Sequence, residues 1–333
     1  MARFGVSYFG IRDPRHASAD LDEIAEAGFH AVTHTFSEHD LRYHEADVAR
    51  LVEETRKRGL EASLDPWGVA GLFGGEAYPE IALTHPEARQ IDAAGQPVPA
   101  ACPCAPATRE LLSRWTRTAV SFGPDILFWD EPHWYLGALR SGPSAPCCRC
   151  VHCAERWRER TGEAALPAEG ASELTTFRND CLRDVLERAI LEAGDAVRHS
   201  LCLLPRGEFA RAGSDEWETF ASLPGLSRLA TDPYWMDRPV VPAEFVRPHA
   251  ETLRRVCTER RLEMEVWLQG IRLPAGRESD LTAATDVAIE CGAERIAYWS
   301  YRGTAGMSWL ACGDPEAAWR AMRDAARRHG GNP

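Results

Sequence analysis

Residues 125–134 read DILFWDEPHW, an apolar run that ends in two adjacent acids. A continuous apolar run of this length is typical of a strand buried on both faces, as the strands of parallel sheets are. We predict a strand over residues 125–129, with the carboxyl groups of Asp130 and Glu131 directly beyond its end. The rest of the fold follows from the pattern on either side of this strand.

Short apolar runs alternate with amphipathic segments along the whole chain. We expect seven further strands, over residues 4–9, 31–36, 60–64, 199–204, 228–231, 262–268 and 295–300. Strands that alternate with segments of helical length are typical of repeated βα units and a parallel sheet. Eight such units predict an α/β fold of the (β/α)8 TIM-barrel type, and an open doubly wound sheet is the alternative.

Capping residues indicate where several helices begin and end. Ser18, followed by acids in the first turn, predicts the start of the helix after the first strand, and Gly28 predicts its end. Thr108 predicts the start of the helix that leads into the DILFW strand. Asp314 followed by Pro315 predicts the start of the last helix, because proline is favoured at the first helical position.

Two long connections interrupt the regular alternation. Residues 66–107 are rich in Gly and Pro without a strong period, and residues 132–170 contain a cysteine cluster. Connections of this length inside a compact domain are usually functional. Because no separate linker is evident, we predict one domain over residues 1–333, with both connections as insertions into the barrel.

Charge and hydropathy exclude several kinds of partner. The net charge of −12 argues against nucleic acid, because binding a phosphate backbone needs clustered Lys and Arg. No apolar run approaches the roughly 18 residues that span a bilayer, and the first residues lead into a strand rather than a signal peptide. We therefore expect a cytoplasmic protein that does not bind membranes, and the composition leaves a homo-oligomer open.

Eleven cysteines in such a chain favour metal ligands over disulfides. Cys148, Cys150 and Cys153 are closely spaced, and we take Cys104 from the preceding connection as a fourth ligand, with Cys102 as the alternative. Four thiolates predict a closed structural zinc site that joins the two connections; free thiols or a disulfide are the other interpretation. Substitute ligands are Cys147 and His152. The cysteines expected to be small buried apolar residues are Cys181, Cys202, Cys257, Cys291 and Cys312.

The active site of a (β/α)8 barrel lies at the carboxyl ends of its strands. Asp130 and Glu131 are the strongest candidates, because desolvation and mutual repulsion keep one of two adjacent carboxyl groups protonated, as a general acid requires. Asp232 is a further candidate acid or base. Aromatic rings near strand ends offer flat apolar surfaces to sugars. The substrate-binding candidates are His34, Asp65, Trp67, Trp134, Tyr234, Gln269, Trp299 and Tyr301.

At these residues the chain resembles the clan A glycoside hydrolases, and within them the family 42 β-galactosidases. In that family the acid/base Glu ends strand four, and a Cys-x-Cys-x-x-Cys run with one earlier cysteine binds zinc. Glu131 matches the acid/base, and the run matches Cys148, Cys150 and Cys153. The resemblance also implies a tyrosine beside the nucleophile at Tyr234 and a tryptophan under the sugar at Trp299. It therefore implies a glycosidase with a role in carbohydrate metabolism.

Two positions depart from the clan's pattern. Asp130 stands where the clan has Asn, and Gln269 stands where the nucleophilic Glu ends strand seven. Three mechanisms remain open. Glu265, on the same strand face as Gln269 but deeper, can act as the second acid. Asp232 can act as the base of an inverting reaction. Alternatively, Asp130 and Glu131 can act together as in substrate-assisted hexosaminidases.

Other functions also fit these residues. A divalent-metal sugar isomerase or epimerase is suggested by His34, Glu131, Asp232 and Glu265 near strand ends, because carboxylates and imidazole bind such metals. The hypothesis without catalysis is a sugar-binding pseudoenzyme that has lost its nucleophile at Gln269. Our leading hypothesis is a glycoside hydrolase that acts on a small glycoside or oligosaccharide, with Glu131 as general acid/base.

Overall fold

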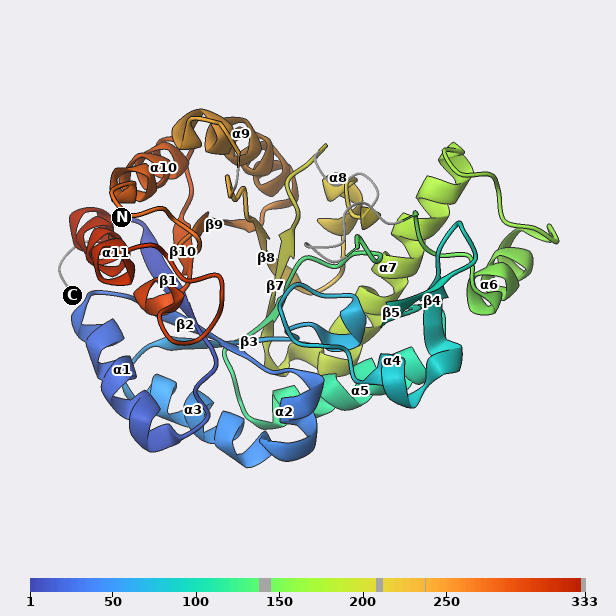
Figure 1. Cartoon of the computed structure of the whole chain (residues 1–333), viewed down its shortest axis with the longest axis horizontal. Coiled ribbons are helices and arrows are strands. Elements are labelled where there is room, and N and C mark those ends of the chain that lie inside the picture. Colours follow the sequence, from blue (N-terminus) through green and yellow to red (C-terminus); the bar gives the residue numbers. More distant parts are fainter. Residues whose placement is uncertain (138–144, 208–211, 237, 331–333) are drawn as a thin grey trace.

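The computed structural model of the chain describes residues 1–137, 145–207, 212–236 and 238–330 (Figure 1). Eight parallel strands close into one barrel, in which the last strand pairs with the first. The predicted (β/α)8 TIM barrel is therefore confirmed. In their order around the barrel, the strands are β1 (Arg3–Tyr8), β2 (Ala31–Thr35), β3 (Glu61–Asp65), β6 (Ile126–Trp129), β7 (Arg198–Leu203), β8 (Leu226–Thr231), β9 (Glu263–Gln269) and β10 (Arg295–Trp299).

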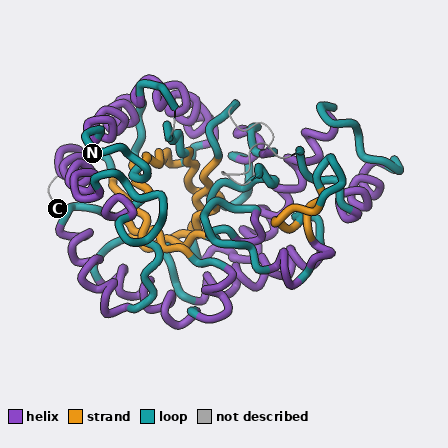
Figure 2. Tube along the Cα trace, viewed as in Figure 1, coloured by secondary structure: helices purple, strands orange, loops and turns teal. Residues whose placement is uncertain are grey.

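Helices surround the strands, and Figure 2 shows most of them as a ring outside the barrel. None of the helices in the described ranges is long and apolar enough to cross a membrane. The helices are α1 (Pro14–Glu26), α2 (Glu38–Tyr43), α3 (Glu45–Lys57), α4 (Ile81–Thr84), α5 (Pro106–Ser121), α6 (Val151–Thr161), α7 (Ser172–Ala193), α8 (Trp217–Phe220), α9 (Pro242–Arg260), α10 (Glu278–Glu290) and α11 (Pro315–Gly330).

Two predicted helix starts were wrong, and prolines account for both. Helix α1 begins at Pro14, where the Asp13 side chain accepts a hydrogen bond from the Arg15 amide, and Ser18 lies inside the helix. Helix α5 begins at Pro106, so Thr108 is a buried residue of its first turn rather than a cap. Proline at the first helical position fixes φ where no amide partner is needed. The predicted start of α11 at Pro315 is confirmed.

The two long connections lie together on one side of the barrel, toward the right of Figure 1. The first contains α4 and a hairpin of antiparallel strands β4 (Arg89–Ile91) and β5 (Pro97–Ala101), which the sequence did not predict. The second contains α6, and an isolated antiparallel bridge joins Cys147 to Asp92 of the first connection. The hairpin is short and carries proline, so its alternating pattern is weak.

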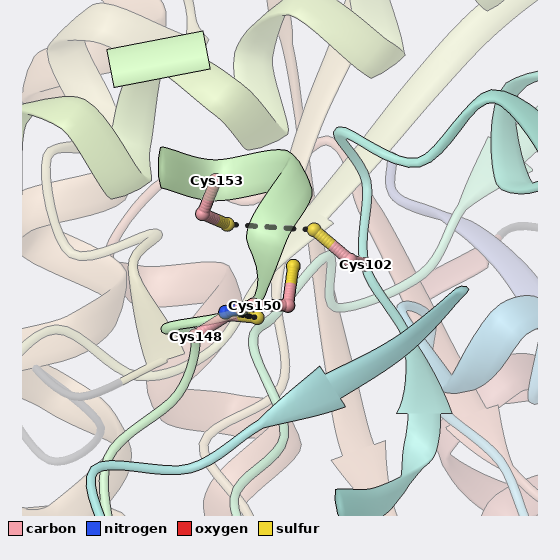
Figure 3. Close-up of side chains that lie close together, drawn as sticks. All are labelled: Cys102, Cys148, Cys150 and Cys153. Atoms are coloured by element: carbon pink, nitrogen blue, oxygen red, sulfur yellow. Dashed lines mark hydrogen bonds between the residues drawn. The ribbon is translucent and has the colours of Figure 1, made fainter. Parts of the chain in front are cut away.

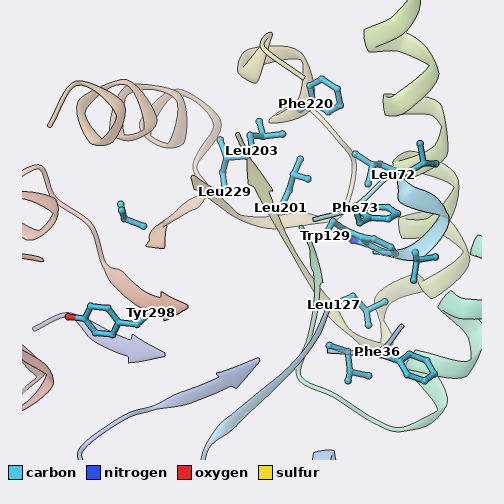
Figure 4. Packing of buried hydrophobic residues seen from close by; sticks show 14 of the residues in the cluster. Phe36, Leu72, Phe73, Leu127, Trp129, Leu201, Leu203, Phe220, Leu229 and Tyr298 are labelled. Carbon is cyan, nitrogen blue, oxygen red and sulfur yellow. The ribbon is translucent and has the colours of Figure 1, made fainter. Parts of the chain in front are cut away.

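Alternation along the strands separates two apolar layers. Leu127 and Trp129 of β6, with Leu201 of β7, point away from the barrel axis and pack under the helices (Figure 4). The Trp129 ring lies 5.7 Å from that of Trp115 on α5. The intervening residues, such as Phe128, fill the barrel interior. Alternate residues of a strand therefore have inward or outward parity, meaning that their side chains point toward or away from the barrel axis. Only a side chain with inward parity can reach the barrel mouth.

Buried ion pairs occupy the amino-terminal end of the barrel interior. Arg228 lies 3.2 Å from Glu61 and 3.3 Å from Glu265, and Arg295 contacts the same two carboxylates. Both arginines are 2% exposed. Their charges outweigh the effect of burial on Glu61 and hold its pKa below the usual value. This layer connects β3, β8, β9 and β10 below the mouth.

Candidate active site

Three strands deliver acids to the carboxyl end of the barrel. Asp65 is the last residue of β3, Asp130 and Glu131 directly follow β6, and Asp232 directly follows β8. Asp65 and Asp232 each lie close enough to the Asp130–Glu131 pair to interact with both of its charges. The carboxyl groups therefore converge, as the rule for barrel strand ends predicted.

Asp65 is fully buried, and neither of its carboxyl oxygens has a hydrogen-bond partner among the described residues. Burial raises the pKa of Asp65 well above its usual value, and the charges of Asp130 and Glu131 raise it further. A buried carboxyl group without a donor or a cation is unfavourable. Its two oxygens can instead accept hydrogen bonds from the hydroxyl groups of a ligand.

Asp232 and Glu131 are joined by a hydrogen bond between their carboxyl groups. Burial raises the pKa of Asp232 well above its usual value, and the charge of Glu131 and this hydrogen bond raise it further. Asp232 is 4% exposed, and its Oδ1 has no partner among the described residues. Because two carboxyl groups in contact resist double ionisation, Asp232 keeps its proton beside the Glu131 carboxyl group.

The Asp130–Glu131 pair is held against the backbone of Gly74, which belongs to the first long connection. The Gly74 amide donates to the carbonyl of Asp130 at 3.1 Å. A Cβ on Gly74 would lie 2.4 Å from Asp130 Oδ2 and 2.7 Å from Glu131 Oε2, so only glycine permits this approach. Glu131 has a φ of 40°, a strained value for a residue with a side chain. Asp130 retains some exposed surface, yet the surrounding protein and the charge of Glu131 raise its pKa.

Two further groups border the acids. The pKa of Tyr234 is raised by burial of its hydroxyl and then by the charge of Asp232. Cys202, an inward residue of β7, lies beside Asp130, and burial raises the pKa of its thiol. Tyr234 was predicted at this place from its position after the sixth barrel strand. Cys202 was predicted only as a buried apolar residue, and its inward parity on β7 is the signal that would have placed it here.

Aromatic rings line the mouth beside the acids. Trp299 stacks on Phe9 with centroids 5.4 Å apart, and Trp67 lies 5.3 Å from the same phenyl ring. Trp267 of β9 lies 5.9 Å from Trp299. The indole nitrogen of Trp67 is buried without a partner among the described residues. Trp67 and Trp299 were predicted here. Phe9 was not, although it continues the inward parity of β1.

Gln269 ends β9 and is 1% exposed. Its Nε2 donates to the carbonyl of Ile271 at 2.9 Å, while its Oε1 has no partner within the described part of the chain. The structure therefore places an amide, and not a carboxylate, at the carboxyl end of β9. A neutral amide cannot form a glycosyl ester, so any second carboxyl group must come from another strand.

Glu265 lies in the ion-pair layer of the barrel interior, where its partners are those of a structural residue. Its carboxylate lies 3.3 Å from Arg228 and from Arg295 in the ion-pair layer, and it accepts from the indole of Trp267 at 3.1 Å. The strand boundary was predicted correctly to within a residue, so no shift of register can raise Glu265 to the mouth. The two buried arginines balance the charge of the Glu265 carboxylate, as expected for a structural ion pair.

Three predicted substrate-binding residues also point elsewhere. The imidazole of His34 faces α3, with Nε2 2.7 Å from Thr55 Oγ1, and burial lowers its pKa to about 3. The Tyr301 hydroxyl donates to Glu23 of α1 at 2.7 Å. The Trp134 indole donates to the carbonyl of Arg178 on α7 at 3.2 Å. His34 has outward parity on β2, while the other two lie beyond strand ends, where the sequence does not determine direction.

Four buried thiols from the two long connections meet beside the barrel: Cys102, Cys148, Cys150 and Cys153, whose sulfur atoms all lie within 4.8 Å of one another (Figure 3). Cys102 follows β5, and Cys153 lies in the first turn of α6. The fourth member is thus Cys102 rather than Cys104, the ligand we had chosen; the Cys104 sulfur lies 3.4 Å from that of Cys181. This group can hold a metal ion.

The acids at the mouth do not form a second group of that kind. Among the residues that the structure describes, no other set of three or more His, Cys, Asp or Glu ligand atoms is gathered so closely. His34 and Glu265, which the isomerase hypothesis requires, are engaged with α3 and with the ion-pair layer. The predicted ligand set of a divalent-metal isomerase is therefore not assembled.

No family model matches the chain, and no curated protein matches it. Solved structures resemble it over nearly the whole chain. The catalytic domain of β-amylase from Paenibacillus polymyxa has a TM-score of 0.69 at 11% identity, with 98% of each chain covered. GH5_18 from Streptomyces cattleya in complex with GlcNAc has a TM-score of 0.62 at 15% identity, covering 100% of this chain and 81% of that one.

A third structure shows the same likeness. The hyperthermostable endo-1,4-β-D-mannanase from Thermotoga petrophila has a TM-score of 0.59 at 9% identity, covering 98% of this chain and 100% of that one. At these identities the likeness establishes a shared fold.

Proposed function

We propose that the protein is a glycoside hydrolase that acts on a small glycoside or oligosaccharide. The observation that carries the proposal is the convergence of buried, mutually repelling acids with aromatic rings at the carboxyl end of the barrel. Solved structures of the same fold support it, since their names are those of a β-amylase, an endo-mannanase and a β-glycosidase. The resemblance to family 42 β-galactosidases remains a prediction.

Glu131 is the general acid in this proposal. It follows β6 directly after Asp130, is hydrogen-bonded to Asp232, and is partly exposed. In the reaction Glu131 gives its proton to the glycosidic oxygen as the bond to the anomeric carbon breaks, and water supplies the hydroxyl group of the new hemiacetal. Asp65 accepts hydrogen bonds from sugar hydroxyls, and Trp67 and Trp299 contact the ring faces.

Asp232 is the partner carboxyl group, because it follows β8, two strands from β6 around the barrel, and contacts Glu131 directly. Once Glu131 has donated its proton, Asp232 can receive a proton from water or attack the anomeric carbon. The anomer released first, measured by NMR on a fresh reaction, distinguishes these two roles. Retained configuration assigns nucleophilic attack to Asp232, and inverted configuration assigns base catalysis.

Glu131→Gln is the direct test of this proposal. The amide keeps the shape but cannot donate the proton, so we expect kcat/KM on an active aryl glycoside or oligosaccharide to fall by about 10²- to 10⁴-fold with an unchanged Tm. The comparison variant is Glu87→Gln, an exposed glutamate in the first long connection, which should retain full activity. Undiminished hydrolysis by Glu131→Gln would refute the assignment. A chain that binds glycans without turning over any of a broad panel would instead be a pseudoenzyme.

Substrate-assisted hydrolysis is the second candidate mechanism. Gly74 keeps the Asp130 and Glu131 carboxyl groups side by side, and Gln269 supplies no acid from β9. Glu131 would then protonate the leaving oxygen while Asp130 orients a 2-acetamido group that attacks the anomeric carbon. Solved structures of the same fold contain GlcNAc and Manb1-4GlcNAc. Activity restricted to 2-acetamido sugars, and lost in Asp130→Asn, would select this mechanism over catalysis by Asp232.

We further propose that zinc occupies the group formed by Cys102, Cys148, Cys150 and Cys153. Four buried thiols fit a closed tetrahedral structural site, and a thiolate zinc site of this kind is typical of a reducing compartment such as the cytoplasm. The site would join the connection that carries Gly74 to the one that follows Glu131. Removing zinc with a chelator is expected to lower Tm and activity together, and readdition should restore both. A Tm that does not change on chelation would contradict a structural metal.

A further inference from the structure

A glutamate of α2 holds the backbone of the first long connection on both sides of Gly74. Glu38, the first residue of α2, is 7% exposed. Its Oε1 accepts a hydrogen bond from the Ala70 amide at 2.8 Å, and its Oε2 accepts one from the Ile81 amide at 2.7 Å. One buried carboxyl group therefore fixes both ends of the segment 70–81.

The middle of this segment contacts the acids at the mouth. The Gly74 amide donates to the Asp130 carbonyl at 3.1 Å, and the Leu72 carbonyl accepts from the His133 amide at 2.9 Å. The Gly74 backbone is also so close to the two adjacent carboxyl groups that a Cβ there would overlap both. A shift of the segment 70–81 would therefore displace these carboxyl groups.

The segment depends on outside partners for its conformation. Residues 72–80 form neither a helix nor a strand, so no regular hydrogen-bond pattern holds them. Ala70 has a φ of 58°, in the left-handed region that a residue with a side chain rarely adopts. An ionised carboxylate suits both amides, because each of its two oxygens accepts hydrogen bonds. The Glu38 side chain is thus matched to this segment.

We propose that Glu38 is a positioning residue for catalysis, which holds the segment 70–81 so that Gly74 keeps the Asp130 and Glu131 carboxyl groups side by side. It acts through two backbone amides and not through the substrate. This inference rests on the proposed function, because it requires that these acids perform the reaction. Its consequence is that kcat depends on a residue of α2.

Glu38 can change its charge near neutral pH. Burial raises its pKa to about 7, although the two amide hydrogen bonds favour the ionised form. Glu80 of the first connection raises this pKa further, Arg42 of α2 lowers it, and Glu80 contacts the His39 imidazole at 3.1 Å. Protonation of Glu38 puts a hydrogen on one of the accepting oxygens, which weakens its bond to an amide. Other charged groups on or against α2, which have partners of their own, are Asp40, Arg12 and Arg114.

Glu38→Gln tests the positioning role in the full chain. The amide keeps the shape but its nitrogen cannot accept a hydrogen bond, so one backbone amide loses its partner. Above pH 7, kcat on an aryl glycoside or oligosaccharide that the unaltered chain hydrolyses should fall by roughly 10- to 100-fold, because small displacements of reacting groups are costly. Glu45→Gln, an exposed glutamate in the first turn of α3, is the matched control and should keep its kcat.

The pH profile gives a readout that a purely structural residue would not change. In the unaltered chain, kcat should fall toward the Glu38→Gln level as pH drops through about 7, and Glu38→Gln should lack this step. His39 also titrates near neutral pH as an exposed imidazole does, so His39→Asn is the control and should keep the step. A step of equal size in Glu38→Gln would refute the assignment to Glu38.

A double substitution tests whether Glu38 acts through Gly74. Two changes that disturb one contact lose less together than the product of their separate losses. We therefore expect kcat of the double variant Glu38→Gln with Gly74→Ala to lie close to that of the weaker single variant. A loss equal to the product of the two single losses would show that Glu38 does not act through this segment.

The outcomes separate this inference from the proposed function. Full kcat in Glu38→Gln, with kcat lost in Glu131→Gln, would overturn the positioning role while the hydrolase stands. Full kcat in Glu131→Gln would overturn both. If Glu38→Gln does not fold, hydrogen exchange in the unaltered chain decides. Protection of the Ala70 and Ile81 amides, corrected for the intrinsic exchange rate, should decrease as pH drops through about 7, and constant protection would overturn the inference.

Discussion

Gly74→Ala should disable the active site without unfolding the protein. The new Cβ would lie 2.4 Å from Asp130 Oδ2 and 2.7 Å from Glu131 Oε2, whereas ordinary contacts begin near 3.4 Å. One or both carboxyl groups must therefore move by about 1 Å, and a displacement of that size at reacting groups can cost about 10²-fold in rate. We expect kcat/KM to fall by roughly that factor.

The same overlap costs about 1 to 3 kcal/mol of folding free energy, which lowers Tm by only several degrees in a chain of this size. Gly74 does not have a positive φ, so alanine adds no backbone strain. Initial rates on an active glycoside, with Tm from differential scanning fluorimetry, measure both effects. Gly5→Ala is the matched control, because its Cβ meets Ala31 at an ordinary 3.4 Å. Full activity in Gly74→Ala would show that the two carboxyl groups do not act where the structure places them.

Two further changes separate the structural acids from the catalytic ones. Glu265→Gln removes a negative charge that Arg228 and Arg295 both contact. We therefore expect the free energy of unfolding in urea to fall by about 3 to 5 kcal/mol, while the folded protein keeps its kcat. A loss of kcat without a loss of stability would show that Glu265 takes part in the mechanism. Asp65 has a raised pKa in the fold, so its contribution to stability is present below the unfolded value near 4 and declines as pH rises through the folded value. Asp65→Asn should therefore raise the free energy of unfolding at pH 7 by about 1 to 2 kcal/mol and flatten its decline with pH. The same substitution should raise KM, because it removes a substrate contact. If the free energy of unfolding fell equally with pH in both proteins, the raised pKa would be contradicted.

The sequence predicted the barrel because period and composition act locally. Each apolar run reports its own burial, and the eight runs need only be counted. The acids followed from the same reasoning, since Asp65, Asp130 and Asp232 stand at inward positions at strand ends. Strand parity, if applied to β2, would also have removed His34, which shares its parity with the outward Val32.

The misplaced residues depend on partners that are distant in sequence. Glu265 has the parity of a site residue, but whether it is catalytic or structural depends on arginines of β8 and β10. Cys102 and Cys104 are two residues apart, and the unpredicted β4–β5 hairpin determines which sulfur meets the cluster. Trp134 and Tyr301 lie beyond their strands, where local sequence does not fix the direction of a side chain.

The ion-pair layer also constrains the order in which the barrel can assemble. Glu61 and Arg295 are 234 residues apart in the chain, and Arg228 lies between them in sequence. In a nascent chain that lacks β10, Glu61 and Glu265 are either exposed to water or buried without the charge of Arg295, and both states are unfavourable. Closure of the ring and neutralisation of its interior are then a single late event, which favours cooperative folding over stable partial barrels.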